Sequence, residues 1–339
     1  MRVLAFLGVV ALVAAAAAAT GGKSSSSSGL TFSKIMTYAE VAAYLRALQR
    51  AHPRVVRVGS VGRSVEGRDI PYVRVSASLD AKQSKTPVML VDALMHAREW
   101  ATLPAALYFL QQAVEHVDKG LDVVVVPVLN PDGYEYSRTK DRLWRKNRSK
   151  KYDKKCVGVD LNRNFNFHWE DFMMSGDGAS DDPCDEAFAG GEAASEPETK
   201  SYQAFVKALN KDKRLKTYVN LHSPSKAIFG PWGYSSFAPT VPDEAKLEKI
   251  EKEANAAMVK AGSKSYTISS MAADYASTGA VTDWVRGVAG VKQSFCLELP
   301  PGATHEGFGV NDADILPLSR RAFEGLKVFA RYAKKPLSQ

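Results

Sequence analysis

The sequence lacks the features of several common protein classes. It contains no Gly-x-Ser-x-Gly motif, the turn that exposes the nucleophile of many serine hydrolases. No long apolar run follows residue 19, so no further membrane span is expected. The net charge is +8, but the basic residues are spread without interleaved aromatics, which argues against nucleic-acid binding. The 45% of hydrophobic residues suffices for a core of one or two domains.

The first residues predict export from the cell. Arg2 is the only charge before a wholly apolar or glycine run over 3–19, which ends in small residues. This pattern is typical of a secretory signal peptide over 1–19, and the run is short for the alternative, a membrane anchor. The segment 20–36 contains five consecutive serines, so we expect a flexible N-terminal tail in the mature protein.

The chain has only three cysteines. In an oxidising compartment two of them are expected to pair. Cys156 and Cys184 flank polar, glycine-containing sequence, whereas Cys296 lies in an apolar run where a free thiol behaves as a small hydrophobe. This favours a disulfide between Cys156 and Cys184, with three free thiols as the alternative.

Apolar periodicity predicts strands alternating with helices. Segments 88–95 and 123–129 are continuous β-branched runs, as expected for central strands covered on both faces. Segments 55–61 and 70–76 alternate apolar and polar residues, like an antiparallel hairpin. We therefore predict one three-layer α/β domain over 37–337, a mixed, mostly parallel central sheet covered by helices. The other predicted elements are helices at 37–50, 99–116, 195–210, 243–261 and 311–333 and strands at 217–222 and 292–299.

Two histidines and a glutamate form a candidate metal site. His96 follows the predicted strand 88–95, and Glu99 opens the next helix, so the two side chains can converge on one ion. Alone, this pair fits a surface salt bridge equally well. His222 ends the predicted strand 217–222 in the same way, and the three together leave zinc an open position for water. Asp160 is either the carboxylate that holds a ligating histidine or part of an ordinary loop turn.

Basic residues in the middle of the chain form a second cluster. Arg145 lies in a basic run, and Asn162 and Arg163 begin the polar stretch 162–197, which is unusually long for a loop unless it builds a site. A substrate carboxylate needs a guanidinium fork, and an oxyanion needs a fixed cation. The alternative is a solvated basic face.

Six short motifs follow one another along the chain. They are His96-Ala97-Arg98-Glu99-Trp100, Asn130-Pro131-Asp132-Gly133-Tyr134, Trp144-Arg145-Lys146-Asn147-Arg148, Gly158-Val159-Asp160-Leu161-Asn162-Arg163-Asn164, Leu221-His222-Ser223 and Phe295-Cys296-Leu297-Glu298-Leu299. From about residue 38 to its end, the sequence resembles the zinc metallocarboxypeptidases typified by pancreatic carboxypeptidase A. The resemblance implies a secreted enzyme that hydrolyses the C-terminal peptide bond of peptides and proteins with one Zn²⁺ per chain.

The same resemblance assigns the catalytic roles. It implies that His96, Glu99 and His222 bind the metal and that Arg145 stabilises the carbonyl oxygen. Glu298 would be the general base, taking a proton from the attacking water. A nucleophilic role for Glu298 is less economical, because the metal already provides a nucleophile.

The resemblance also assigns the substrate contacts. Asn162 and Arg163 would bind the terminal carboxylate, with Arg98 as an auxiliary cation. Tyr275 would be the mobile cap over the substrate. It also implies the disulfide between the two cysteines of the central region. As an alternative from another class, a silent peptide-binding or zinc-binding module would not need all of these groups together.

Residue 282 bears on specificity. In members of the family that cut after basic residues, an aspartate precedes an Asp-Trp pair at the base of the side-chain pocket. Here Thr282 precedes Asp283, and a pocket without that carboxylate favours apolar or aromatic C-terminal residues. Asp274, beside Tyr275, leaves mixed specificity open.

The remaining expectations concern assembly and processing. We expect a monomer that contacts peptide C-termini, no nucleic acid, and no membrane after signal cleavage. The segment before residue 38 is too short for an inhibitory prodomain, so we expect activity without proteolytic processing. Asn147-Arg148-Ser149 is an N-glycosylation acceptor whose occupancy stays open.

Overall fold

A computed structural model describes residues 32–79 and 84–335. The predicted signal peptide and most of the predicted serine-rich tail lie outside these residues. Within them, no helix combines the length and apolar character needed to cross a bilayer.

A mixed sheet of eight strands forms the centre of the described structure. The strand order is β1-β2-β4-β3-β5-β8-β6-β7. Strands β4, β3, β5 and β8 run parallel to one another, β6 pairs parallel with β7, and the other three neighbouring pairs are antiparallel. The strands are β1 (Val56–Arg63), β2 (Asp69–Val75), β3 (Val88–Asp92), β4 (Asp122–Val126), β5 (Leu215–His222), β6 (Ala227–Gly230), β7 (Thr267–Ser270) and β8 (Gln293–Glu298).

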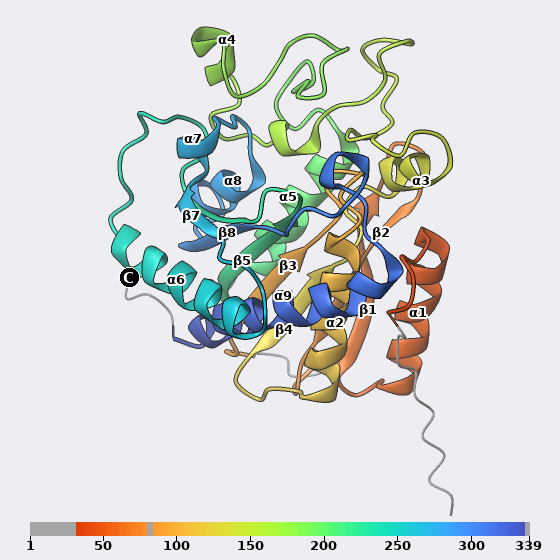
Figure 1. Cartoon of the computed structure of the whole chain (residues 1–339), viewed down its shortest axis with the longest axis vertical. Helices are drawn as coiled ribbons and strands as arrows, with labels where there is room; N and C mark the ends of the chain where they lie inside the picture. The colour runs from red at the N-terminus through yellow and green to blue at the C-terminus, as the bar shows by residue number, and fades with distance from the viewer. Residues whose placement is uncertain (1–31, 80–83, 336–339) are drawn as a thin grey trace, which may run out of the picture.

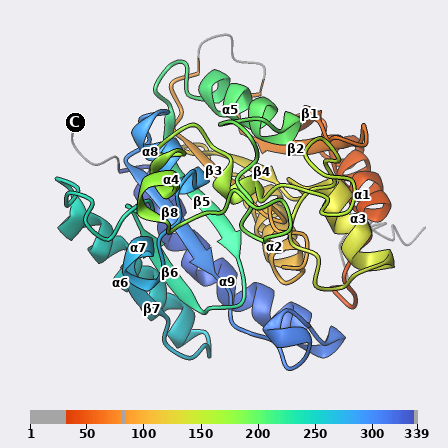
Figure 2. The ribbon, with the colours of Figure 1, turned by 90° about the horizontal axis from the view of Figure 1, so that it is seen from above.

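Helices cover both faces of this sheet, which confirms the predicted three-layer α/β fold. In β3 the side chains of Met89 and Val91 pack into one apolar cluster, while Val88 and Leu90 pack into another on the opposite face. Figure 2 shows α5 on one side of the strands and α2 and α9 on the other. The helices are α1 (Tyr38–Ala51), α2 (Thr102–Glu115), α3 (Pro131–Thr139), α4 (Asp171–Ser175), α5 (Pro197–Leu209), α6 (Glu244–Lys260), α7 (Met271–Asp274), α8 (Val281–Gly287) and α9 (Asp312–Ala333).

Two differences from the sequence expectations matter for the site and the core. Helix α2 begins at Thr102 rather than at residue 99, because residues 96–101 form turns. Phe32 and Ile35, which the sequence assigned to the flexible tail, are buried, and the Phe32 ring packs edge-on against Tyr108. The core therefore extends several residues before the predicted start at residue 37.

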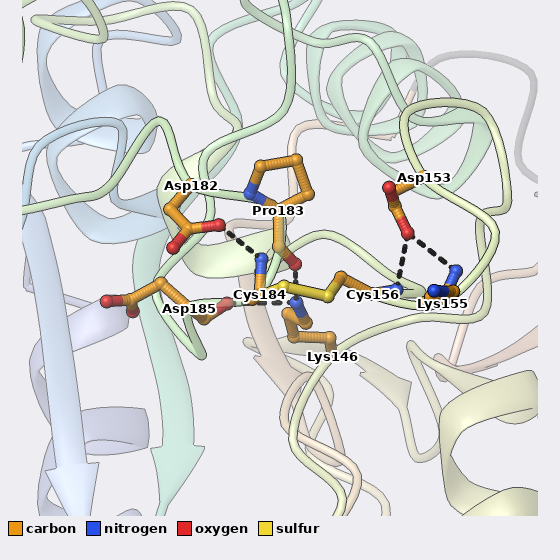
Figure 3. Close-up of a disulfide and its surroundings, with 8 residues drawn as sticks. All are labelled: Lys146, Asp153, Lys155, Cys156, Asp182, Pro183, Cys184 and Asp185. Atoms are coloured by element: carbon orange, nitrogen blue, oxygen red, sulfur yellow. Dashed lines mark hydrogen bonds between the residues drawn. A yellow bond between two sulfur atoms is a disulfide. The ribbon is translucent and has the colours of Figure 1, made fainter.

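The segment between α3 and α5 forms loops and short helices at the top of the molecule (Figure 1). It contains nearly all of the long polar stretch 162–197 noted in the sequence. A disulfide joins Cys156 to Cys184 within it, and Cys296 is a buried free thiol. Figure 3 shows Lys146 beside this bridge, donating to the carbonyl oxygens of Pro183 and Asp185.

Removing this disulfide is expected to destabilise the fold. The bridge closes a sequence separation of 28 residues, and its restriction of the unfolded chain's entropy predicts a stabilisation of about 3 to 4 kcal/mol. The double variant Cys156→Ser, Cys184→Ser should therefore unfold at lower denaturant concentration than the parent. Cys296→Ser provides a comparison with one thiol removed and the bridge intact. An unchanged midpoint in the double variant would contradict the prediction.

Candidate metal centre and substrate site

Two histidines and a glutamate meet at the carboxyl ends of parallel strands. His96 follows β3, and His222 is the last residue of the neighbouring strand β5. Glu99 Oε1 lies 2.7 Å from His96 Nδ1, and Glu99 Oε2 lies 2.9 Å from His222 Nδ1. All three residues are buried, and one donor atom from each lies within 4.8 Å of the other two.

A turn, not a helix, brings His96 and Glu99 together. The Glu99 amide donates to the carbonyl oxygen of His96, and the hydroxyl of Thr102 donates to the carbonyl oxygen of Glu99. Helix α2 starts only at Thr102. The expected convergence of the two side chains therefore holds, but the expected helical spacing is not its cause.

Asp160 connects His96 to Arg145. Its Oδ1 lies 3.0 Å from His96 Nε2, and its Oδ2 accepts from Arg145 Nε and Nη2 at 3.0 and 2.8 Å. Burial opposes ionisation of Asp160, but Arg145 and His96 hold its pKa well below the usual range. Burial and Arg145 also lower the pKa of His96, which favours the neutral imidazole that a metal requires.

A buried polar network lies behind His222. Asn220 Oδ1 contacts His222 Nε2, and Asn220 Nδ2 donates to Asp92. Asp92 also accepts from the hydroxyls of Tyr202 and Tyr218. Sequence reasoning missed this network. Its signal was an aspartate inside an otherwise apolar strand and an asparagine two residues before His222, hence on the same face of β5.

Glu298 ends strand β8 directly beside the metal group. In the parallel pairing of β5 with β8, Glu298 is the register partner of His222. The Ser225 amide donates to Glu298 Oε2 at 3.3 Å. Burial, reinforced by the charge of Glu99, raises the pKa of Glu298 to about 7. Such a carboxyl group can accept and release a proton near neutral pH.

Three further predicted residues lie around this centre. Arg145 Nη1 is 4.0 Å from Glu99 Oε1. Asn162 and Arg163 belong to a short 3-10 helix (Leu161–Arg163) that follows Asp160 directly, and both are buried. The Oδ1 of Asn162 accepts from the amide of Val281, while Arg163 Nε has no hydrogen-bond partner in the described structure. A buried guanidinium nitrogen without a partner is suited to an incoming anion.

For the last three predicted residues, the described part of the chain gives a position but no direct contact with the metal group. Arg98 donates to Glu186 and to the carbonyl oxygen of Leu143, and no contact links it to Asn162 or Arg163 among the described residues. Tyr275 follows α7 and is 43% exposed, as a mobile cap would be. Thr282 lies on α8 and is buried.

Asp283, next to Thr282, has a buried carboxyl group that contacts backbone amides of another segment. It accepts hydrogen bonds from the amides of Gly233 and Tyr234. Burial raises its pKa to about 7, despite these donors. Asp283 thus holds the segment after β6 against α8, beside Thr282.

A sequence profile described as "Zinc carboxypeptidase" matches residues 41–325. The chain belongs to the zinc carboxypeptidase family. A protein named carboxypeptidase B from Astacus astacus is 33% identical over 309 residues, which cover 89% of this chain and 97% of that protein. A zinc carboxypeptidase from Simulium vittatum is 31% identical over 88% of this chain and 96% of its own length.

Solved structures agree with this family membership. The crystal structure of carboxypeptidase A from Helicoverpa armigera superposes with a TM-score of 0.82 and 34% identity, over 92% of this chain and 76% of that one. The protein is a metallocarboxypeptidase that uses one zinc ion. The buried pair of imidazoles and one carboxylate is a donor set that fits zinc.

The structure also bears on the glycosylation acceptor. Asn147 is fully buried, and its amide donates to Glu196 and Glu198. Its Oδ1 accepts from the amides of Ser149 and Val159. A glycan on this nitrogen would break the contacts that hold the basic segment in place, so the folded chain does not present Asn147 as an acceptor.

Proposed function

We propose that the enzyme removes single residues from peptide C-termini with Glu298 as the general base. The observation that supports this most strongly is the position of Glu298. It is the register partner of His222 on the adjacent strand, next to a buried group of zinc donors. In this proposal His96, Glu99 and His222 hold the zinc.

Glu298 moves the proton in the proposed reaction. Zinc supplies Lewis acidity that activates water as a nucleophile. Glu298 accepts the proton that the attacking water loses, and a C–O bond forms at the last peptide carbonyl. When the C–N bond breaks, Glu298 delivers the proton to the departing amine. A pKa of about 7 allows Glu298 to do both near neutral pH.

Arg145 stabilises the negative charge that develops on the carbonyl oxygen. Its guanidinium is fixed by two hydrogen bonds to Asp160, so little reorganisation is needed during the reaction. Asn162 and Arg163 bind the terminal carboxylate, and the free Arg163 Nε is available for it. Arg98 is an auxiliary cation, and Tyr275 closes over the substrate.

The proposed preference is for apolar or aromatic C-terminal residues. Thr282 is buried and uncharged, so a lysine or arginine side chain entering the pocket there would lack a counter-charge. The names of the relatives include both carboxypeptidase A and carboxypeptidase B. The residue at position 282 therefore carries the specificity argument.

A panel of substrates that differ only in the last residue tests this preference. We expect kcat/KM for C-terminal phenylalanine to exceed that for arginine by at least about 100-fold, the cost of an unpaired buried charge. Thr282→Asp should raise activity on arginine, whereas Thr282→Val should not. Asp274 is exposed, so its carboxylate could reach a basic C-terminal side chain. If specificity is mixed, Asp274→Asn lowers the activity on arginine. Equal activity on both substrates in the parent enzyme would refute the proposal.

Localisation and assembly complete the proposal. We propose cleavage of a signal peptide after residue 19, secretion, and function as a monomer. The run over 3–19 supports export. N-terminal sequencing of the protein recovered from the medium would test the cleavage, and its sedimentation would test the monomer.

A further inference from the structure

A cavity opens away from the proposed zinc site, between α6 and the ends of β6 and β7. Its volume is about 390 Å³. Because β6 runs antiparallel to β8, with Ala227 opposite Glu298, its other end at Gly230 points away from the catalytic glutamate. Three glutamates of α6 line the cavity, and none of its described lining residues is basic. The lining comprises Gly230, Pro231, Val241, Glu244, Ala245, Leu247, Glu248, Glu251, Ile268, Ser269 and Ser270.

Glu251 is the central feature of this cavity. It is only 4% exposed, and among the described residues no hydrogen bond contributes to its electrostatic environment, only burial and the charges of nearby side chains. Glu251 lies on the buried side of α6, next to Leu247 and Ala254. A carboxyl group therefore occupies a position where the helical periodicity predicts an apolar side chain. A Cβ atom at Gly230 would lie 2.6 Å from Glu251 Oε1. Glycine at position 230 thus leaves the carboxyl group free to occupy its observed position.

Within the described residues, the carboxyl oxygens of Glu251 lack a protein partner but are open to the cavity, where water or a ligand can satisfy them. Two of the neighbouring charges, Glu248 and Glu244, have the same sign, while Lys252 pairs with Glu248 at 2.7 Å. The cavity therefore attracts positive charge. Its remaining walls include the apolar side chains of Val241, Leu247 and Ile268.

We infer that this cavity binds the side chain of an arginine or lysine presented by another polypeptide, with the cationic group at Glu251. Such a side chain carries a charged end on an apolar stem, which matches a carboxylate at one end and apolar walls along the side. A divalent metal fits less well. Among the described residues, His96, Glu99 and His222 form the one group whose donors converge on a single point.

The binding test uses the zinc-loaded enzyme and a capped amino acid that carboxypeptidases cannot cleave. Nα-acetyl-arginine N-methylamide should bind saturably by calorimetry. The neutral isostere, Nα-acetyl-citrulline N-methylamide, should bind at least about tenfold more weakly, because it lacks the charge. Glu251→Gln should weaken binding of the arginine compound by a similar factor. Glu253→Gln, on the same helix but paired with Arg331 outside the cavity, should not.

Binding should also depend on pH in a defined direction. Burial, together with the charges of Glu248 and Glu244, raises the pKa of Glu251 to about 8, and the segments from β6 and β7 that line the cavity add no titratable side chain. Ligand binding must therefore release a proton at pH 7 but scarcely at pH 9. From that pKa we expect the arginine compound to bind about tenfold more tightly at pH 9.

The same pKa supplies a folding control for the variant. The folded protein keeps a proton on Glu251 that the unfolded chain loses as pH rises from about 4.5 to 8. The parent thus loses stability over that range through this group. The melting temperature of Glu251→Gln minus that of the parent should therefore be larger at pH 9 than at pH 5.5. Zinc content and peptidase activity should be unchanged.

Several results would overturn the inference. One is no saturable binding of the arginine compound at millimolar concentration. Another is binding that survives Glu251→Gln in a folded, active variant. The third is Ca²⁺ binding that depends on Glu251 while the arginine compound does not bind. An amidated decapeptide with one central arginine tests whether the arginine comes from a polypeptide. Binding at least as tight as that of the capped residue supports this source. If the capped residue binds and the peptide does not, a polypeptide source is refuted.

Discussion

Glu298→Gln is expected to lower kcat by about 10² to 10⁴-fold, the usual contribution of a positioned acid or base. The amide is nearly the same size as the carboxyl group and can still accept from the Ser225 amide, so the surroundings should be preserved. It cannot accept the proton from water. Turnover of a peptide with a C-terminal phenylalanine measures the effect, and metal analysis should still find one zinc per chain.

Two controls separate this prediction from a general loss of structure. Glu298→Asp keeps the acid but shortens the side chain, so it should retain more activity than the glutamine variant. The thermal midpoint of Glu298→Gln should be no lower than that of the parent near neutral pH, because the glutamine removes a buried ionisable group. Full activity in the glutamine variant would refute the assignment of the base.

His222→Ala is expected to weaken zinc binding by more than about 100-fold, because loss of an outer partner of a metal ligand alone costs about 10- to 100-fold. The variant keeps His96 and Glu99 but leaves only two protein donors, fewer than zinc sites require. Peptidase activity should fall with the bound metal. Competition with a chromophoric chelator measures the affinity.

Asn220→Ala gives a graded comparison for the same site. It removes the group that contacts His222 Nε2 and leaves all three donors in place. We expect a loss of zinc affinity of about 10- to 100-fold, smaller than that of His222→Ala. Circular dichroism of both variants checks that they fold. Unchanged zinc affinity in a folded His222→Ala protein would contradict the proposed ligand set.

The general fold could be predicted because its central strands have a simple pattern. Strands β3 and β4 are buried on both faces. Strands of this kind have uninterrupted runs of apolar, β-branched residues, which the sequence shows directly. Strand ends were also informative. His222 and Glu298 end neighbouring parallel strands, so their proximity follows from the topology.

Other features depend on contacts that local sequence does not encode. The turn at Glu99 is stabilised by Thr102 and by the distant His222. The apolar periodicity of the sequence does not include these contacts, so it predicted that the helix begins at residue 99 rather than at Thr102. Phe32 is buried because Tyr108, 76 residues later in the sequence, packs against it. The serine-rich composition around it predicted a flexible segment instead.

Glu251 shows a signal that was present but not used. It falls four residues after Leu247 on the apolar side of α6, next to Ile250. A charged residue at such a position indicates a buried carboxyl group. The sequence could not show that Gly230 makes room for it, because that contact joins segments that are distant in sequence.

The alignment of His222 with Glu298 has a practical consequence for redesign. Backbone hydrogen bonds between β5 and β8 set the spacing of these two side chains, and no loop lies between them in the sheet. Segments beyond Ser225 and Leu299, whose amides contact Glu298 and His222, can therefore be lengthened, shortened or exchanged while the strand pairing keeps that spacing. Variation of those segments is a route to new peptide selectivity that leaves the reacting groups in place.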